Sequence, residues 1–397
     1  MHASTILRRS LADVLGPMHA ARSGRLLGAV EALVAGRRLT LTDLARSWPG
    51  ATWMHAPLKA LDRLLGNPRL HVAIAPLQRA MSRWLMRGGS RPLLLVDWAD
   101  LKGDGRWALL RAAVPVGGRA LTVYEQIFPL LRMGQPQAQR EFLHQLTRVI
   151  PAGTRPIIIT DAGFRSDWLR AVQAMGWDFI GRLRNNTQVA CGDEASWRGC
   201  AQLHALASGG VLDLGPYRMV KGAPMCCRLV LAARRPKGRE KRTRKGLPEQ
   251  GRSSRKARKA AREPWLLVTS LTTRTHAAAA VAAAYGKRMQ IEEAFRDLKS
   301  HRYGAGFEDS LSRKAERLGV LLLLHALASF AAWLMGLAVQ TTAHRDPLSR
   351  QPGQRGRYSL IRRGIEWLRR VELPPGTRER LMLKRLAELV KSSPVSP

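Results

Sequence analysis

The segment PLLLVDWADL, residues 92–101, decides the fold of this chain. Its first part is a short, continuous apolar run, which is typical of a strand buried on both faces of a sheet. A second run of this kind, PIIITDAG at residues 156–163, also meets an aspartate where its apolar residues end. The pattern therefore puts Asp97 and Asp161 at the carboxyl ends of two buried strands, the edge at which α/β sheets bind ligands.

The segments around these two runs alternate between strand and helix patterns. Residues 107–116 and 119–128 are strand-like runs around a Gly-Gly pair, which predicts a hairpin. Helical periodicity follows at 137–150 and 166–176, and the apolar segment DFIGRLR at 178–184 predicts another strand. This order indicates an α/β fold in which helices cover the faces of a sheet.

Helical patterns fill residues 1–85. The segment LTLTDLARSW at 39–48 has a helical apolar face with Thr40 or Thr42 as its cap, and a second periodic segment begins at Met54 after Pro49-Gly50. Helix, short turn and helix outline a helix-turn-helix, which would contact DNA. An ordinary pair of packed helices gives the same pattern.

After residue 184 the pattern changes to antiparallel strands, at 211–220, 225–233 and 265–271. We therefore predict a helical N-terminal DNA-binding domain, the first part of the α/β core, a β-rich insertion, the second part of the core and a basic C-terminal region. Their bounds are 1–85, 86–185, 186–274, 275–340 and 341–397.

The charge of the chain is extreme. Its 397 residues include 66 Lys and Arg against 29 Asp and Glu, a net charge of +37. Such a surface attracts polyanions, among which we expect DNA, although an Arg-rich composition from a GC-rich genome is the simpler explanation. The four cysteines have no zinc-site spacing and the N-terminus has no signal-peptide pattern, so we expect reduced thiols in a cytosolic protein.

One segment, 319–339, is long and apolar enough to cross a membrane. It is a single such segment, it contains His325, and its helical pattern begins in the charged residues before it. We therefore favour a fully buried helix and expect no membrane partner.

A third carboxylate comes from the segment AYGKRMQIEEAFRDLKSHRYG, residues 284–304. On one continuous helix at about 100° per residue, four polar residues lie within about 60° of one another: Tyr285, Arg288, Glu292 and Lys299. Ile291, Phe295 and Leu298 form the adjacent apolar stripe, Arg296 borders the polar face, and Glu293 points away from it. The geometry selects Glu292 over Glu293, although an ordinary amphipathic helix with an Arg288–Glu292 ion pair has the same pattern.

The three carboxylates suit metal-dependent phosphoryl transfer. Asp97, Asp161 and Glu292 can hold two divalent cations about 3.5–4 Å apart, and carboxylates are the ligands that Mg²⁺ prefers. Arg288 and Lys299 would bind phosphates, and Tyr285 would stack on a base or bond a phosphate.

These residues resemble the DDE transposases of bacterial insertion sequences. Tyr285, Arg288, Glu292 and Lys299 have the spacing of the Tyr-Arg-Glu-Lys signature of the insertion-sequence-four group. The resemblance implies an RNase H-like catalytic core with a β-rich insertion, Mg²⁺ with Mn²⁺ as a substitute, and a homodimer on paired double-stranded transposon ends. It also implies end cleavage, joining of 3′-hydroxyls to target DNA, and a base-holding role for Trp265. Met289 and Ala162 depart from residues of some relatives, which leaves a DNA-hairpin step open.

Three other functions remain. A nuclease on the same fold would share the carboxylates but would not join strands. A catalytically inactive DNA-binding protein would not need Mg²⁺, and a membrane-anchored basic protein would depend on residues 319–339 alone.

The sequence generates one prediction by itself. Residues 234–262 contain 14 basic and two acidic residues and almost no large apolar side chain, so they form a basic loop that binds phosphates. Deleting this loop should weaken binding uniformly across DNA sequences and flatten the dependence of log Kd on log salt concentration. If the slope of log Kd against log salt concentration stays unchanged in a binding titration, the loop does not contact DNA.

Overall fold

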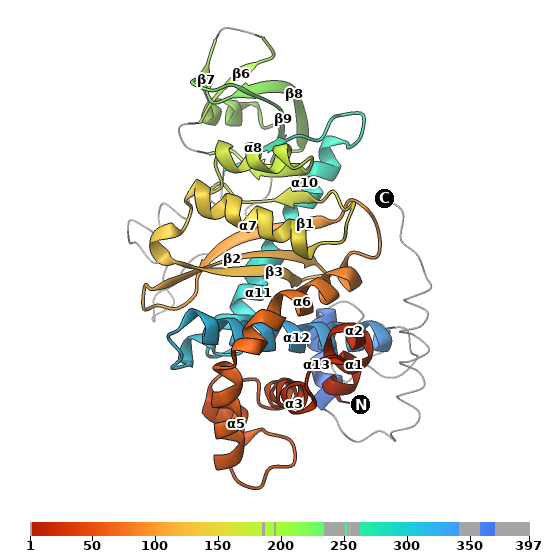
Figure 1. Cartoon of the computed structure of the whole chain (residues 1–397). Coiled ribbons are helices and arrows are strands. Elements are labelled where there is room, and N and C mark those ends of the chain that lie inside the picture. Colours follow the sequence, from red (N-terminus) through yellow and green to blue (C-terminus); the bar gives the residue numbers. More distant parts are fainter. Residues whose placement is uncertain are drawn as a thin grey trace. The chain divides into compact units, whose positions relative to one another are not determined.

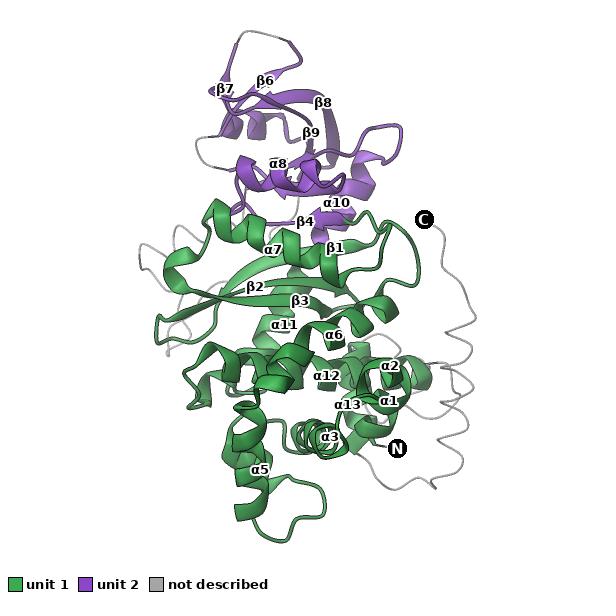
Figure 2. Cartoon of the chain, viewed as in Figure 1, with its two compact units in different colours: residues 1–156, 289–397 green, residues 157–288 purple. Residues whose placement is uncertain are grey.

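The computed structural model describes residues 2–184, 187–193, 196–233, 251, 254, 263–340 and 358–369 (Figure 1). The chain forms two compact units, shown in Figure 2: unit 1 is Met1–Pro156 with Met289–Pro397, and unit 2 is Ile157–Arg288. Each unit contains helices and strands, which confirms the α/β class. The predicted domain bounds stay a prediction. Nearly all of the predicted basic loop and most of the C-terminal region lie outside the described residues.

The N-terminal part of unit 1 is helical, as predicted. Its helices are α1 (Ala3–Ser10), α2 (Ala12–Leu15), α3 (Ala20–Gly36), α4 (Leu41–Arg46), α5 (His55–Leu65) and α6 (Pro68–Leu85). The Thr40 hydroxyl caps α4, because it accepts a hydrogen bond from the Asp43 amide at 3.1 Å. α4 and α5 correspond to the two helices of the predicted helix-turn-helix outline.

The strands of unit 1 are antiparallel. They are β1 (Leu93–Asp100), β2 (Trp107–Pro115) and β3 (Ala120–Pro129), in the order β3-β2-β1, and η1 (Leu130–Arg132) follows them. Gly117 and Gly118 form the predicted hairpin turn with φ of 79° and 83°, a conformation that favours glycine. α6 and α7 (Pro136–Val149) both contact β3, so the strands that carry Asp97 and its neighbours lie in the core.

The apolar run at 319–339 is part of α12 (Ala315–Gln340), a helix in the interior of unit 1. By length and composition α12 is the one described helix that could cross a membrane, and 72% of its most apolar window is buried. α12 contacts α3, α6, β3 and α13 (Leu360–Arg369). This burial accounts for the apolar run as a core helix, the interpretation that the sequence favours.

Unit 2 combines a parallel strand pair with an antiparallel extension. Its strands are β4 (Ile157–Ile159), β5 (Asp178–Arg182), β6 (Gln188–Cys191), β7 (Arg198–Gly199), β8 (Val211–Met219), β9 (Met225–Ala232) and β10 (Trp265–Thr269). They are ordered β4-β5-β10-β9-β8-β6-β7. β4 and β5 are parallel and joined through α8 (Ser166–Ala174), whereas β10 pairs antiparallel with β5 and with β9. β8, β9 and β10 confirm the predicted β-rich insertion, which also contains η2 (Cys200–Leu206) and four free cysteines.

The predicted continuous helix over 285–299 is wrong. The chain forms α10 (Ala278–Gly286) and α11 (Met289–Lys299), with a turn between them. Gly286 ends α10 because glycine is a poor helix residue and a common helix terminator. In the turn, the amides of Lys287 and Arg288 bond the carbonyls of Ala284 and Tyr285, each at 3.0 Å. Tyr285 and Arg288 therefore do not share a helix with Glu292 and Lys299.

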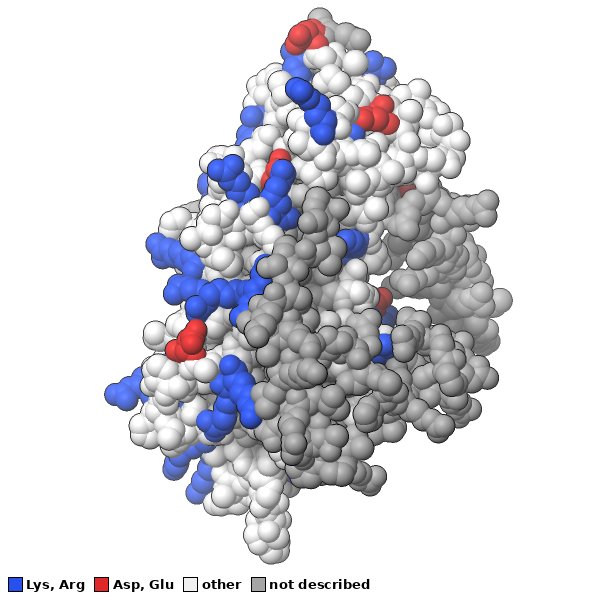
Figure 3. All heavy atoms as spheres, turned by 90° about the vertical axis from the view of Figure 1, so that its right-hand side faces the viewer, with Lys and Arg blue, Asp and Glu red and all other residues white. Residues whose placement is uncertain are grey.

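The described surface is strongly basic, as the composition predicts. On the face drawn in Figure 3, Lys and Arg side chains are spread over much of the described surface, with isolated acidic groups between them. This distribution suits a polyanionic partner.

The packing of α13 on α12 generates a prediction. A Cβ atom at Gly364 would overlap the carbonyl oxygen of Ala332, so this glycine allows the two helix backbones to approach closely. Gly364→Ala should therefore destabilise unit 1 by about 1–3 kcal/mol through overpacking. Chemical denaturation, followed by circular dichroism, measures the change.

Gly24→Ala is the matched control. Gly24 is an exposed glycine inside α3, and a Cβ atom added there meets nothing within 4 Å. This substitution should stabilise the protein by roughly 0.5–1 kcal/mol, since alanine is the better helix former. Equal effects of the two substitutions would contradict the close approach of α12 and α13.

Candidate active site

Asp97 lies on β1 in a row of charged residues that crosses the strands of unit 1. It is paired with Arg111 of β2, which is paired in turn with Glu125 of β3. Residues directly opposite each other in antiparallel strands project from the same face of the sheet. The Arg111 guanidinium lies 4.9 Å from the ring centre of Phe295, which belongs to α11. Asp97 therefore projects from the face that α11 covers.

The pair Arg111–Glu125 is a buried ion pair. Their side chains are 1% and 4% exposed, and the guanidinium Nη2 lies 2.7 Å from the Glu125 carboxylate. His325 of α12 is nearby: burial, reinforced by the charge of Arg111, lowers the pKa of His325 to about 3, so its imidazole is neutral at physiological pH. The charge of Arg111, which is buried beside Asp97, is therefore neutralised by Glu125 from the neighbouring strand.

Glu292 lies in the first turn of α11, in the same unit as Asp97. Ile291, Phe295 and Leu298 are buried, which confirms the predicted apolar stripe, and α11 contacts β1, β2 and β3. Glu293 forms ion pairs instead, with Arg119 at 3.9 Å and with Arg296. Glu293 is therefore held by neighbouring cations.

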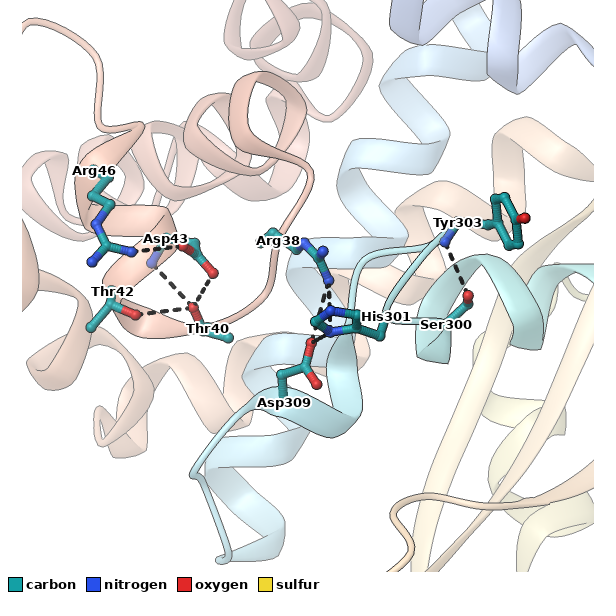
Figure 4. Close-up of polar contacts among 9 residues, drawn as sticks. All are labelled: Arg38, Thr40, Thr42, Asp43, Arg46, Ser300, His301, Tyr303 and Asp309. Atoms are coloured by element: carbon teal, nitrogen blue, oxygen red, sulfur yellow. Dashed lines mark hydrogen bonds and ion pairs between the residues drawn. The ribbon is translucent and has the colours of Figure 1, made fainter. Parts of the chain in front are cut away.

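The end of α11 is fixed to the strand that carries Asp97. The Lys299 amine donates a hydrogen bond to the carbonyl of Asp100 at 2.7 Å and lies 3.3 Å from the Glu308 carboxylate, in η3 (Phe307–Asp309). Beyond it, His301 Nδ1 lies 2.7 Å from the Asp309 carboxylate, which Arg38 also contacts at 3.3 Å (Figure 4). α11 is thus tied to β1 on one side and to the segment between α3 and α4 on the other.

Asp161 lies in unit 2, two residues beyond β4. Its Oδ1 accepts a hydrogen bond from the amide of Gly163 at 2.8 Å, and a Cβ atom at Gly163 would come within 3.1 Å of the same oxygen. Because β4 and β5 are parallel, Asp161 and Arg182 follow strand ends on the same edge of the sheet. The tight turn fixes the carboxylate at that edge.

Tyr285 connects the other predicted residues of unit 2. Burial raises the pKa of Tyr285, the charges of Arg288 and Arg182 lower it, and the charge of Asp161 raises it, so these three groups lie close enough to act on the hydroxyl. Its ring centre lies 4.7 Å from that of Trp265 in an edge-to-face contact. Tyr285 is only 3% exposed, so its ring packs inside the unit.

The predicted residues thus form two groups. Unit 1 holds Asp97 and Glu292 with Arg296 and Lys299, and unit 2 holds Asp161 with Trp265, Tyr285 and Arg288. Among the described residues, no group of three or more Asp, Glu, His or Cys side chains is close enough to hold a metal ion. Sequence reasoning missed Arg182, although its position at the end of the predicted strand 178–184 is the same signal that singled out Asp161.

Comparison with known proteins identifies the class and then the family. The fold is a mixed α/β fold whose strands pair in both antiparallel and parallel fashion, with Asp97 on β1 and Asp161 just beyond β4. The family model described as "Transposase DDE domain" matches residues 89–330, and the chain belongs to this family. A search of curated proteins finds no match. Among solved structures, the chain is similar to the piggyBac transposase in its synaptic complex with hairpin DNA. That likeness has 10% identity and a TM-score of 0.40, and it covers 98% of this chain and 81% of the other.

The buried pair beside Asp97 generates a prediction. Glu125→Gln leaves the Arg111 guanidinium in the core without its counter-charge, which should cost about 3–5 kcal/mol of unfolding free energy. Denaturant titration measures the loss.

Asp62→Asn serves as the matched control. Asp62 forms an ion pair with Arg317 at 2.6 Å, but its side chain is 63% exposed. Water and salt screen such a pair, so its removal should cost less than about 1 kcal/mol. If both variants lose a similar amount of unfolding free energy, burial does not make the Arg111–Glu125 pair more important to stability than an exposed pair.

Proposed function

We propose that the chain is a transposase that cleaves DNA at the ends of its element and joins the 3′-hydroxyls to target DNA by two-metal-ion phosphoryl transfer. The observation that carries this proposal is the family match over residues 89–330, a region that spans Asp97, Asp161 and Glu292. The Tyr-Arg-Glu-Lys signature of the insertion-sequence-four group supports the finer assignment.

Asp97, Asp161 and Glu292 would hold the cations. Their oxygens are hard ligands that fit Mg²⁺, with Mn²⁺ as a substitute. When bound, two such cations would activate the attacking oxygen and stabilise the leaving oxygen of an in-line displacement. The hydrogen bond from Gly163 to Asp161 supports this role, because it orients the carboxylate before any cation is bound.

Cationic side chains of both units would hold the DNA backbone. Arg288 and Asp161 both act on the Tyr285 hydroxyl, and Lys299 bonds the carbonyl of Asp100 at the end of the strand that carries Asp97. Arg296 is 55% exposed and keeps donors for a phosphate beyond its ion pair with Glu293. Trp265 would hold an unstacked base, since its ring is only partly covered by Tyr285.

The DNA partner is proposed to be double-stranded transposon ends and target DNA, bound by a homodimer in the bacterial cytoplasm. The net charge of +37 and the helical pair α4–α5 support DNA binding. A nuclease that cuts without joining is the nearest alternative, and an inactive DNA-binding protein is the next.

A supercoiled plasmid that carries the element's own ends provides the test. With Mg²⁺ the parent protein should cut at the ends and give joined products, and without Mg²⁺ it should do neither. Glu292→Gln should lose more than the roughly 10–100-fold of activity that removal of an outer metal-site partner costs. Gel analysis of cut and joined DNA measures both steps.

Glu293→Gln is the matched control, because it changes the neighbouring residue in the same way. It should stay within about tenfold of the parent, since Glu293 forms ion pairs with Arg119 and Arg296 and is not one of the proposed metal ligands. A Glu292→Gln variant that still cuts would overturn the site, and cutting without joining would establish the nuclease alternative. Binding of end DNA in Ca²⁺ should be equal for both variants.

A further inference from the structure

Unit 2 contains a cavity of about 560 Å³ beside the candidate aspartate. Most of its lining comes from three segments: the residues after Asp161, between Ala162 and Ser166; the end of β5, from Gly181 to Arg184; and the turn between β8 and β9, from Met219 to Gly222. Leu169, Thr187, Gln188 and Val268 complete the wall. The volume lies within the range of small-molecule sites. Because Ala162 forms part of the wall, the cavity begins one residue from Asp161.

Four cations line this cavity: Arg165, Arg182, Arg184 and Lys221. Glu263 is their carboxylate neighbour, 2.6 Å from Arg184 and 4.0 Å from Arg182. Within the described part of the chain, Arg165 and Lys221 have no ion-pair partner. The cavity therefore carries a net positive charge, which attracts an anion.

Arg182 is incompletely satisfied by the protein. Its side chain is 14% exposed, and its Nε is buried without a hydrogen-bond partner among the described residues. Its Nη2 reaches the carbonyl oxygens of Glu263 and Pro264 only at 3.5 Å. A buried donor without a partner is costly, and an anion in the cavity would offset that cost.

The turn between β8 and β9 holds Lys221 at the cavity in a strained backbone. Val220 has a φ of 67°, a left-handed conformation that a β-branched residue rarely adopts. Its amide donates to the Gln188 carbonyl at 3.0 Å, its carbonyl accepts from the Ala223 amide at 3.1 Å, and Arg170 of α8 bonds the Ala223 carbonyl. Strain that neighbours hold in place is typical of ligand sites.

We propose that this cavity, with Arg165 and Lys221 at its rim and Arg182 in its wall, binds a backbone phosphate of the DNA strand next to the phosphate that is cleaved. The inference rests on the proposed function, because it takes Asp161 as part of the catalytic centre. It gives the β-rich insertion a role, since the turn between β8 and β9 supplies one of the cavity's cations. The ligand is a phosphodiester, recognised by charge and not by base sequence.

The double variant Arg165→Gln with Lys221→Gln tests the proposal. Both side chains are exposed, so the variant should fold like the parent. Binding of end DNA is measured in Ca²⁺, which separates binding from cleavage. The magnitude of the slope of log Kd against log salt concentration should fall by about 2, roughly one per lost phosphate contact.

Single uncharged methylphosphonates, placed in turn along each strand of the end DNA, locate the contact. One or two positions beside the cleaved phosphate should weaken binding by the parent about tenfold and leave binding by the double variant unchanged. Full sensitivity of the double variant at every position beside the cut would overturn the proposal.

Arg274→Gln is the control for lost charge. Arg274 is exposed and follows β10, whose end is paired with the beginning of β5, so it lies at the sheet edge opposite the cavity. This variant should keep the parent's methylphosphonate pattern, and loss of that pattern would also overturn the proposal. If the parent protein fails to cut in Mg²⁺ but has methylphosphonate-sensitive positions in Ca²⁺ that the double variant lacks, the proposed transposase activity fails and a phosphate site at this cavity stands.

Discussion

The burial of Arg111 is the constraint on which unit 1 depends. A guanidinium that is 1% exposed needs a counter-charge at contact distance, and Glu125, opposite it on β3, supplies one at 2.7 Å. The pairing fixes the register of β2 against β3, because a slip of one residue would turn one of the two charges to the other face. Asp97 stands next in the same row, so the register of the candidate carboxylate follows from that of the ion pair.

α11, the helix that contains Glu292, is fixed to the same strands. Phe295 packs over the Arg111 guanidinium, and Lys299 bonds the carbonyl of Asp100, so both the middle and the end of the helix are fixed to the strands. Glu292 lies one turn before Phe295 on the same helix. The packing of α11 on the strands of unit 1 leaves Glu293 in ion pairs with Arg119 and Arg296.

The sequence predicts the elements better than their connections. Continuous apolar runs predicted β1 and β4, and Gly-Gly predicted the hairpin of β2 and β3, because these signals are local. Arg111 and Glu125 lie in two segments whose sequence predicts strands and nothing more. Their pairing depends on the register of β2 against β3, which local sequence patterns do not predict. The break between α10 and α11 was missed although Gly286 is a local signal, because helical periodicity on both sides outweighed one glycine. Which residues of the two units meet at the catalytic centre stays a prediction.

In a chain with so many Lys and Arg side chains, the contacts that each cation makes indicate whether it serves the fold or is available to a ligand. Arg111 is buried and forms a close ion pair with Glu125 at 2.7 Å, so its charge is balanced within the fold. Arg182 is 14% exposed, its Nε has no hydrogen-bond partner among the described residues, and its nearest carboxylate, that of Glu263, lies 4.0 Å away. Burying a charge without a close partner is unfavourable unless a ligand supplies the missing contacts. The contrast between these two arginines, rather than the total charge of +37, is the reason to look for phosphate beside Asp161.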